Sequence, residues 1–123
     1  MATGTIQNSG AIQELTVTIS GGSTPILEFA TWGSVTAYQV GRMVFVRFHG
    51  FMPSADITSS SVVATIANGT ASIDASAPVH IGKSACNGIA SIGKGSNTIS
   101  MNSVSRQVSG SNAWSYCEFI YAV

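Results

Sequence analysis

Two residues with chemically useful side chains, Arg47 and His49, stand two positions apart in the segment QVGRMVFVRFHGF, residues 39–51. In an extended strand, residues at this spacing share one face, and their side chains lie about 7 Å apart. A guanidinium and an imidazole placed in this way can hold one ligand together. Two other interpretations stay open: the pair faces only solvent on one side of a sandwich, or Arg47 bridges to an acidic residue of a neighbouring subunit.

Recognition of a saccharide requires an aromatic ring that lies against the apolar face of the sugar and a few polar groups that hold its hydroxyls. From the aromatic and polar residues of the chain we predict a ligand-binding site. For each aromatic residue, the competing interpretation is packing in the core or between subunits. The wider set of candidates also includes Tyr38, Glu118 and Tyr121, and the predicted site consists of Trp32, Arg47, His49, Asp56, Trp114 and Tyr116.

The acidic residues do not indicate an enzyme. A glycosidase needs two carboxyl groups about 5 to 9.5 Å apart across a cleft. No GxSxG element, phosphate-binding loop or cluster of metal ligands occurs in the sequence. We therefore expect a protein without catalytic residues, metal or cofactor. The spacing favours no pair among the five carboxylates, which are Glu14, Glu28, Asp56, Asp74 and Glu118.

The two cysteines do not indicate a metal site either. Cys86 and Cys117 are too few and too far apart for zinc, and His49 and His80 do not complete a site at a familiar spacing. We predict that both cysteines are small buried side chains.

The composition is that of one domain with few charges. Hydrophobic residues make up 45% of the 123 residues, but only 8% are charged, and five basic residues balance five acidic ones. Soluble domains usually contain about 25% charged residues. A neutral chain of this kind offers no electrostatic attraction to nucleic acid and little resistance to self-association. We expect an oligomer that does not bind nucleic acid.

The N-terminal segment MATGTIQNSGAIQ lacks the basic start and the apolar stretch of a secretion signal. Aliphatic or aromatic runs, such as residues 43–46 and 119–123, are at most five residues long, whereas a membrane crossing needs about 20 residues. We therefore expect a soluble protein that is made in the cytoplasm and does not insert into membranes.

Apolar residues recur mostly at every second position, and Gly, Asn, Ser and Pro interrupt the chain at short intervals. This pattern predicts one all-β domain, an antiparallel β-sandwich like a jelly roll. For residues 57–67 a helix is the alternative, although Ser, Thr and Val disfavour helix interiors. The predicted strands span residues 12–20, 26–32, 35–40, 43–51, 62–66, 79–85, 88–92, 97–101 and 114–122.

A longer pattern starts at YQVGRMVFVRF, residues 38–48, where a strand with a tyrosine leads into a glycine turn and then into an apolar Met-Val strand. The segments VVATIANG, NGIASIGKGSNTIS and NAWSYCEFIYAV continue it. Together they resemble the C-terminal head domain of bacteriophage tail receptor-binding and baseplate proteins, over about residues 32–123. The chain departs from the family at residues 67–78, ANGTASIDASAP, where relatives commonly carry a Pro-Gly-Tyr-Arg-Pro-like element. The positions that carry the first part of the resemblance are Tyr38, Gly41, Met43, Val44 and Val46.

The resemblance implies a homotrimer of sandwiches at the tail tip of a phage or prophage virion. Such a protein binds saccharides of the bacterial cell surface without catalysis and contacts other tail proteins. Residues 32–123 would form the head domain, and residues 1–31 an attachment segment or an extra strand. The alternative function is a structural baseplate, fibre-tip or capsid-decoration protein that binds no glycan.

Overall fold

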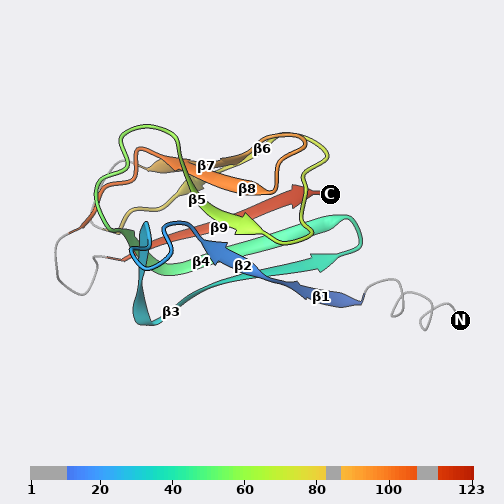
Figure 1. Ribbon diagram of the computed structural model, residues 1–123, viewed down its shortest axis with the longest axis horizontal. Coiled ribbons are helices and arrows are strands. Elements are labelled where there is room, and N and C mark those ends of the chain that lie inside the picture. Colours follow the sequence, from blue (N-terminus) through green and yellow to red (C-terminus); the bar gives the residue numbers. More distant parts are fainter. Residues whose placement is uncertain (1–10, 83–86, 108–113) are drawn as a thin grey trace, which may run out of the picture.

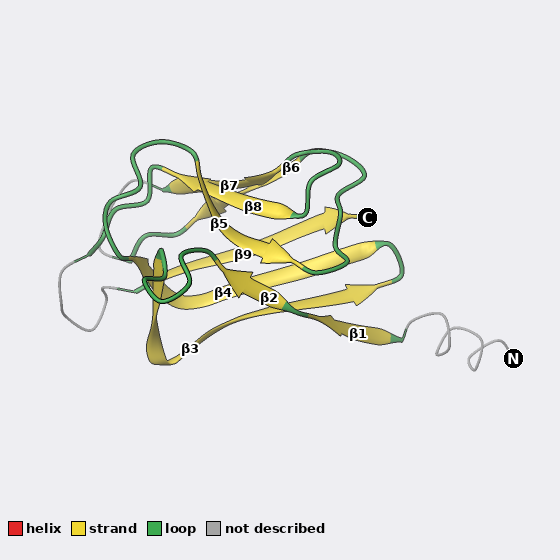
Figure 2. Ribbon diagram, in the orientation of Figure 1, coloured by secondary structure: helices red, strands yellow, loops and turns green. Residues whose placement is uncertain are grey.

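The computed structural model describes residues 11–82, 87–107 and 114–123. These residues form nine strands and contain no helix, as Figure 2 shows. In this described part of the chain there is consequently no helix of the length and apolarity that a membrane crossing requires. The prediction of an all-β protein is confirmed.

The strands form two antiparallel sheets, consistent with a β-sandwich (Figure 1). The described part of the predicted N-terminal segment supplies β1, β2 and the first residues of β3 to these sheets. The four-stranded sheet has the order β1-β3-β4-β9 and consists of β1 (Ile12–Leu15), β3 (Leu27–Val40), β4 (Met43–Pro53) and β9 (Ser115–Ala122). The five-stranded sheet has the order β2-β5-β8-β7-β6 and consists of β2 (Val17–Ile19), β5 (Ser61–Ile66), β6 (Ala75–Val79), β7 (Gly88–Ile92) and β8 (Thr98–Asn102).

The core lies between the sheets and follows from the alternation of side chains along the strands. In β4, Val44, Val46 and Phe48 are buried, whereas the intervening Phe45 and Arg47 are exposed. β9 alternates in the same way. Each large apolar side chain that is fully buried contributes about 1.5–3 kcal/mol, so these two strands are fixed in the orientation that the alternation predicts.

β9 links the two sheets along one side of the molecule. The backbone of Tyr116 exchanges two hydrogen bonds with His80, at 2.8 and 2.9 Å, and the backbone N–H of Ser72 donates to the carbonyl of Ala122 at 2.8 Å. Ser72 precedes β6 and His80 follows it, so the outer edge of β9 is held at both ends by the segment that carries β6. This edge of the four-stranded sheet is therefore partly covered.

Residues 12–20, predicted as one strand, form two. β1 pairs with β3, whereas β2 pairs with β5 in the other sheet. Between them the carbonyl of Thr16 accepts a hydrogen bond from the N–H of Ala67 at 2.9 Å. Leu15 and Val17 both pack against the core. The alternation of apolar and polar residues therefore continues across residue 16, and it does not indicate that the chain passes from one sheet to the other there.

The region around β6 also differs from the prediction. β6 lies where the sequence predicts a loop, and the predicted strand 79–85 is wrong for residues 81 and 82, while residues 83–86 lie outside the described part of the chain. Pro78 argues against a central strand, because it cannot donate a ladder hydrogen bond. It is tolerated in β6 because β6 is an edge strand. β5 forms as predicted, so the helical alternative over residues 57–67 is wrong.

Cys117 is 2% exposed, which confirms the predicted burial, whereas Cys86 lies outside the described residues. Burial, together with the smaller effect of the Glu118 charge, raises the pKa of the Cys117 thiol to about 12. The thiol is therefore neutral at ordinary pH and unreactive as a nucleophile.

Tyr121 joins β9 to the turn that follows β5. Its hydroxyl donates a hydrogen bond to the carbonyl of Gly69 at 2.6 Å, and the side chain is 2% exposed. Asn68, in this turn, has a positive φ of 60°. Burial raises the pKa of Tyr121 from 10.0 to about 12. The stability that this neutral hydroxyl contributes is therefore fully present below pH 10 and is lost as the pH rises through 12.

We predict that Tyr121→Phe lowers the free energy of unfolding by about 1–3 kcal/mol at neutral pH, because it leaves the buried carbonyl of Gly69 without its donor. Urea denaturation followed by circular dichroism measures the change. Tyr38→Phe is the matched control, because Tyr38 is 39% exposed and its loss of a hydroxyl costs little. Equal effects of the two substitutions would contradict the role of the buried hydrogen bond.

Candidate functional site

The outer face of the four-stranded sheet carries most of the predicted site residues. Arg47 and His49 lie next to each other on this face of β4, the strand between β3 and β9. In the sheet register, Arg47 stands opposite Glu118 of β9, and His49 stands opposite Tyr116 of the same strand. The predicted shared face of Arg47 and His49 is thus present, and β9 adds two further polar or aromatic side chains beside them.

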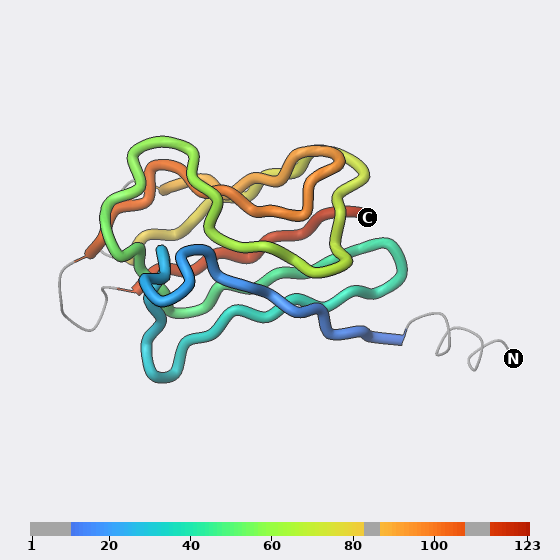
Figure 3. The backbone as a smooth tube through the Cα atoms, viewed as in Figure 1, coloured from blue at the N-terminus to red at the C-terminus, as the bar shows by residue number. Residues whose placement is uncertain are grey.

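A large bulge in β3 brings Trp32 to the same place. Phe29 pairs with Phe51 and Ser34 pairs with His49, so residues 30–33 of β3 stand opposite the single residue 50 of β4. The tube through β3 turns sharply in its first half, at the lower left of Figure 3. The sequence predicts two strands here, 26–32 and 35–40, and the structure has one strand with an interruption of the ladder.

Two glycines make this bulge possible. Gly50 has a φ of +67°, and a Cβ atom at this position would lie 2.8 Å from Cη2 of Trp32. A Cβ atom on Gly33 would lie 2.6 Å from the carbonyl oxygen of His49. Only glycine leaves the space for the backbones to approach and for the indole ring to lie over β4.

The bulge completes an aromatic cluster of Trp32, His49, Trp114 and Tyr116. The Trp32 ring is stacked on Tyr116 with centroids 6.3 Å apart and planes at 22°, and it meets Trp114 edge to face at 6.3 Å. The imidazole of His49 lies 5.4 Å from Trp32 and 5.1 Å from Tyr116. Trp32 remains 52% exposed and Tyr116 36% exposed. The cluster therefore presents aromatic surface to solvent instead of filling the core.

Arg47 is oriented toward this cluster. Its Nη2 lies 3.3 Å from Nδ1 of His49. A guanidinium can only donate, so Nδ1 is the acceptor in this contact. The contact holds the guanidinium beside the aromatic rings.

A shallow depression of about 460 Å³ runs along the same face from this point. Its polar side contains Arg47, His49 and Glu118, while Tyr38 and Phe45 belong to its apolar side. The residues that line it are Ser34, Thr36, Tyr38, Phe45, Val46, Arg47, His49, Glu118, Phe119 and Ile120.

On the side of Tyr38, Phe45 and Ile120 the depression merges with an apolar part of the same face. We call this region the apolar half; it consists of five large side chains that are each at least 39% exposed, namely Ile12, Tyr38, Met43, Phe45 and Ile120. In the register, Tyr38 lies between Glu14 and Phe45, and Phe45 lies beside Ile120. The face thus has an aromatic and polar end and an apolar end.

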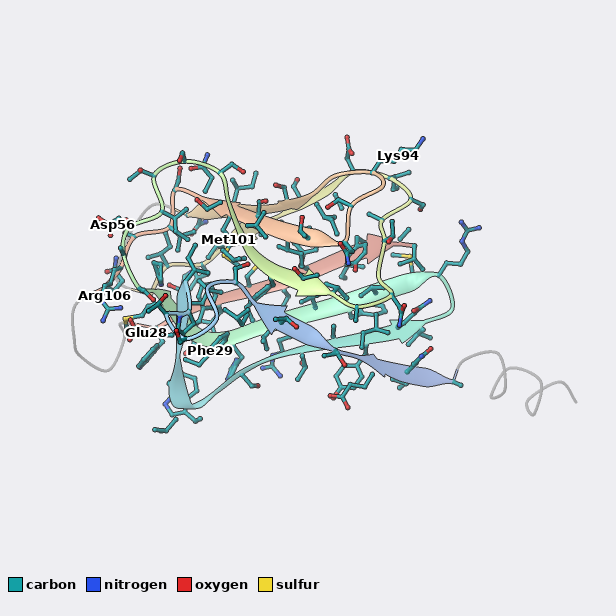
Figure 4. The ribbon with its side chains drawn as sticks, viewed as in Figure 1. Glu28, Phe29, Asp56, Lys94, Met101 and Arg106 are labelled. Atoms are coloured by element: carbon teal, nitrogen blue, oxygen red, sulfur yellow. The ribbon has the colours of Figure 1, made fainter. Side chains whose placement is uncertain are left out.

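Asp56, the sixth predicted site residue, has a different set of contacts. Its Oδ1 accepts a hydrogen bond from the backbone N–H of Arg106 at 2.8 Å. The Nη1 atom of Arg106 donates to Glu28 at 2.7 Å and to the carbonyl of Pro53 at 2.9 Å. Figure 4 shows Asp56, Arg106 and Glu28 one below another at the left end of the molecule. These contacts give Asp56 a role in fixing the segment around Arg106.

Several residues that line the depression are not in the predicted set, and Glu118 is the charged one among them. Glu118 lies on the floor of the depression opposite Arg47. The alternation of residues 114–122 already places Glu118 on the face of Tyr116, so the signal was present. What the sequence does not contain is the pairing of β9 with β4, which puts the carboxylate next to the guanidinium.

The groups on this face can bind a ligand. It offers exposed aromatic rings, guanidinium donors, a carboxylate acceptor and the hydroxyls of Ser34 and Thr36. Among the residues that the structure describes, no group of three or more His, Cys, Asp or Glu side chains is placed to hold a metal ion. Asp74 accepts a hydrogen bond at 2.8 Å from the backbone N–H of Lys94, which lies in the connection between β7 and β8.

Comparisons with protein-family models, with curated proteins and with solved structures find no match to this chain.

We predict that Gly50→Ala displaces the Trp32 ring, because the added methyl group would overlap the indole. In a Trp114→Phe background Trp32 is the only tryptophan of the chain. Its emission maximum and its quenching by iodide should change, and the free energy of unfolding should fall by about 1–3 kcal/mol more than in the control below.

Gly41→Ala is the matched control for this substitution. Gly41 also has a positive φ, +59°, but nothing lies within 4 Å of the position of its Cβ atom. It therefore incurs the same backbone strain, about 1–2 kcal/mol, without a collision. Identical tryptophan emission in both variants would show that Gly50 does not position Trp32.

Proposed function

We propose that this protein is a receptor-binding protein of a phage or prophage tail tip that recognises carbohydrate on the bacterial cell surface without catalysis. The observation that carries the proposal is the exposed aromatic cluster with Arg47 beside it. The resemblance of residues 32–123 to the head domains of tail receptor-binding and baseplate proteins supports it as well.

The geometry suits a sugar ring in two ways. The exposed face of Trp32 or Tyr116 matches the apolar C–H face of a pyranose, which gains by leaving water. Arg47, His49 and Glu118 lie beside these rings and can hydrogen-bond to the hydroxyls at the edge of the sugar. Because these residues stand on paired strands, little backbone freedom is lost when a ligand binds.

For the finer architecture we propose a jelly-roll-like sandwich that assembles as a homotrimer. The apolar half supports this proposal, because one chain alone leaves five large apolar side chains in water on a face that carries few charges. A trimer would cover these side chains and present three saccharide sites. In the virion, the trimer would contact other tail proteins.

The apolar half also favours a second candidate function, that of a structural baseplate, fibre-tip or capsid-decoration protein. In that case both ends of the face would contact proteins of the virion, and the aromatic cluster would bind no glycan. The two functions differ in what happens when the cluster is removed.

We predict that Trp32→Ala and Tyr116→Ala each weaken binding to bacterial envelope polysaccharide by about tenfold or more, because each removes a stacking surface at the centre of the site. Binding of the intact assembly to an array of bacterial glycans and to host cells measures the effect. Ile89→Ala is the control, because Ile89 is 48% exposed on the outer face of the five-stranded sheet. If host range and glycan binding are unchanged in both cluster variants, the structural function replaces the proposed one.

We also predict that light scattering gives a mass three times the 12.6 kDa of one chain. Phe45→Lys should convert the trimer to monomers, because it places a charge within the apolar half. Ile89→Lys adds the same charge to the opposite sheet and should leave the mass unchanged. A monomeric wild-type protein would overturn the trimer.

A further inference from the structure

The only two opposite full charges on the depression, Arg47 and Glu118, are direct neighbours across two strands. Arg47 of β4 pairs with Glu118 of β9, and both are exposed. The Cβ atoms of residues paired in this way are about 4.5–5.5 Å apart. The two groups therefore lie within the reach of a single sugar ring.

Arg47 and Glu118 do not form an ion pair with each other. Among the residues that the structure describes, the one ion pair is that of Arg106 with Glu28, at 2.7 Å. Arg47 instead donates to Nδ1 of His49. A guanidinium has five N–H donors. Among the contacts of the described residues, most of these donors and the carboxylate of Glu118 have no partner, so they can bind a ligand.

We infer that this site selects uncharged, hydroxyl-rich pyranoses over acidic saccharides, an inference that rests on the proposed function and defines its ligand class. A hydroxyl group both donates and accepts, so a neutral sugar satisfies Arg47 with one hydroxyl and Glu118 with the next. The ionised group of a carboxylated or phosphorylated sugar has no proton to donate to Glu118, and it places a second negative charge beside that carboxylate.

The other charges of the chain reinforce this selection. The positive charge of Arg47 is balanced by Glu118 on the same floor, and the remaining acid of this sheet face, Glu14, lies opposite Tyr38. The face therefore has no excess of positive charge that would attract an anion from a distance. Short hydrogen bonds and stacking decide which saccharide binds.

The test compares neutral oligosaccharides on an array with the same oligosaccharides carrying a uronic acid or sialic acid residue. Wild-type protein should bind the neutral series at least about tenfold more tightly. Glu118→Gln should weaken neutral binding by about tenfold, since the charged acceptor of a hydrogen bond is replaced by a neutral one, and should strengthen acidic binding several-fold, since the repulsion is removed. Neutral binding should also be insensitive to salt.

Glu14→Gln is the matched control, because it removes the same charge from the same face at the edge strand β1. It should change neither series by more than about twofold. Denaturant titration of both variants confirms that they are folded.

The outcomes separate the inference from the proposed function. If the wild-type protein binds acidic saccharides as well as neutral ones, or if Glu118→Gln does not alter the ratio between them, the ligand class is wrong while saccharide recognition stands. If no saccharide on the array or on host cells is bound, the proposed function is overturned together with the inference.

Discussion

The candidate site depends on the position of β4 in the middle of the four-stranded sheet. Val46 and Phe48 pack in the core with almost no exposure. Because side chains alternate along a strand, their burial forces Arg47 and His49 onto the opposite face. A shift of register by one residue would bury a guanidinium and expose phenylalanine, so the packing of the core holds the polar side of the site in place.

The sequence predicts the parts of the fold that follow from this alternation. The faces of residues 43–49 and 114–122 are as expected, because each strand is long enough to show its period of two. The split of residues 12–20 between two sheets is not visible, since both halves bury the same kind of side chain. The edge strand β6 was missed because Pro78 normally argues against a strand.

The site residues also divide into those that alternation places and those that only the fold places. Arg47, His49 and Tyr116 could be placed on their faces by alternation alone. Trp32 joins them only through the bulge opposite Gly50, which depends on the pairing of β3 with β4 and on the space left by a glycine. Asp56 is engaged by Arg106, a residue 50 positions away in the sequence. Contacts of this range are set by the fold and have no local signal.

The scarcity of charged residues limits how the proposed site can recognise a ligand. With five basic and five acidic residues in the whole chain, long-range attraction contributes little, and association at an ordinary rate of about 10⁵–10⁷ M⁻¹s⁻¹ is expected. Recognition of a saccharide at the proposed site would then come from stacking and from hydrogen bonds of defined direction. Both interactions are weak at a shallow depression. In the proposed trimer, three such depressions that engage one polysaccharide surface would raise the overall avidity by about 10²–10⁴. A weak and neutral site, repeated in the proposed trimer, would therefore be sufficient for the proposed adhesion.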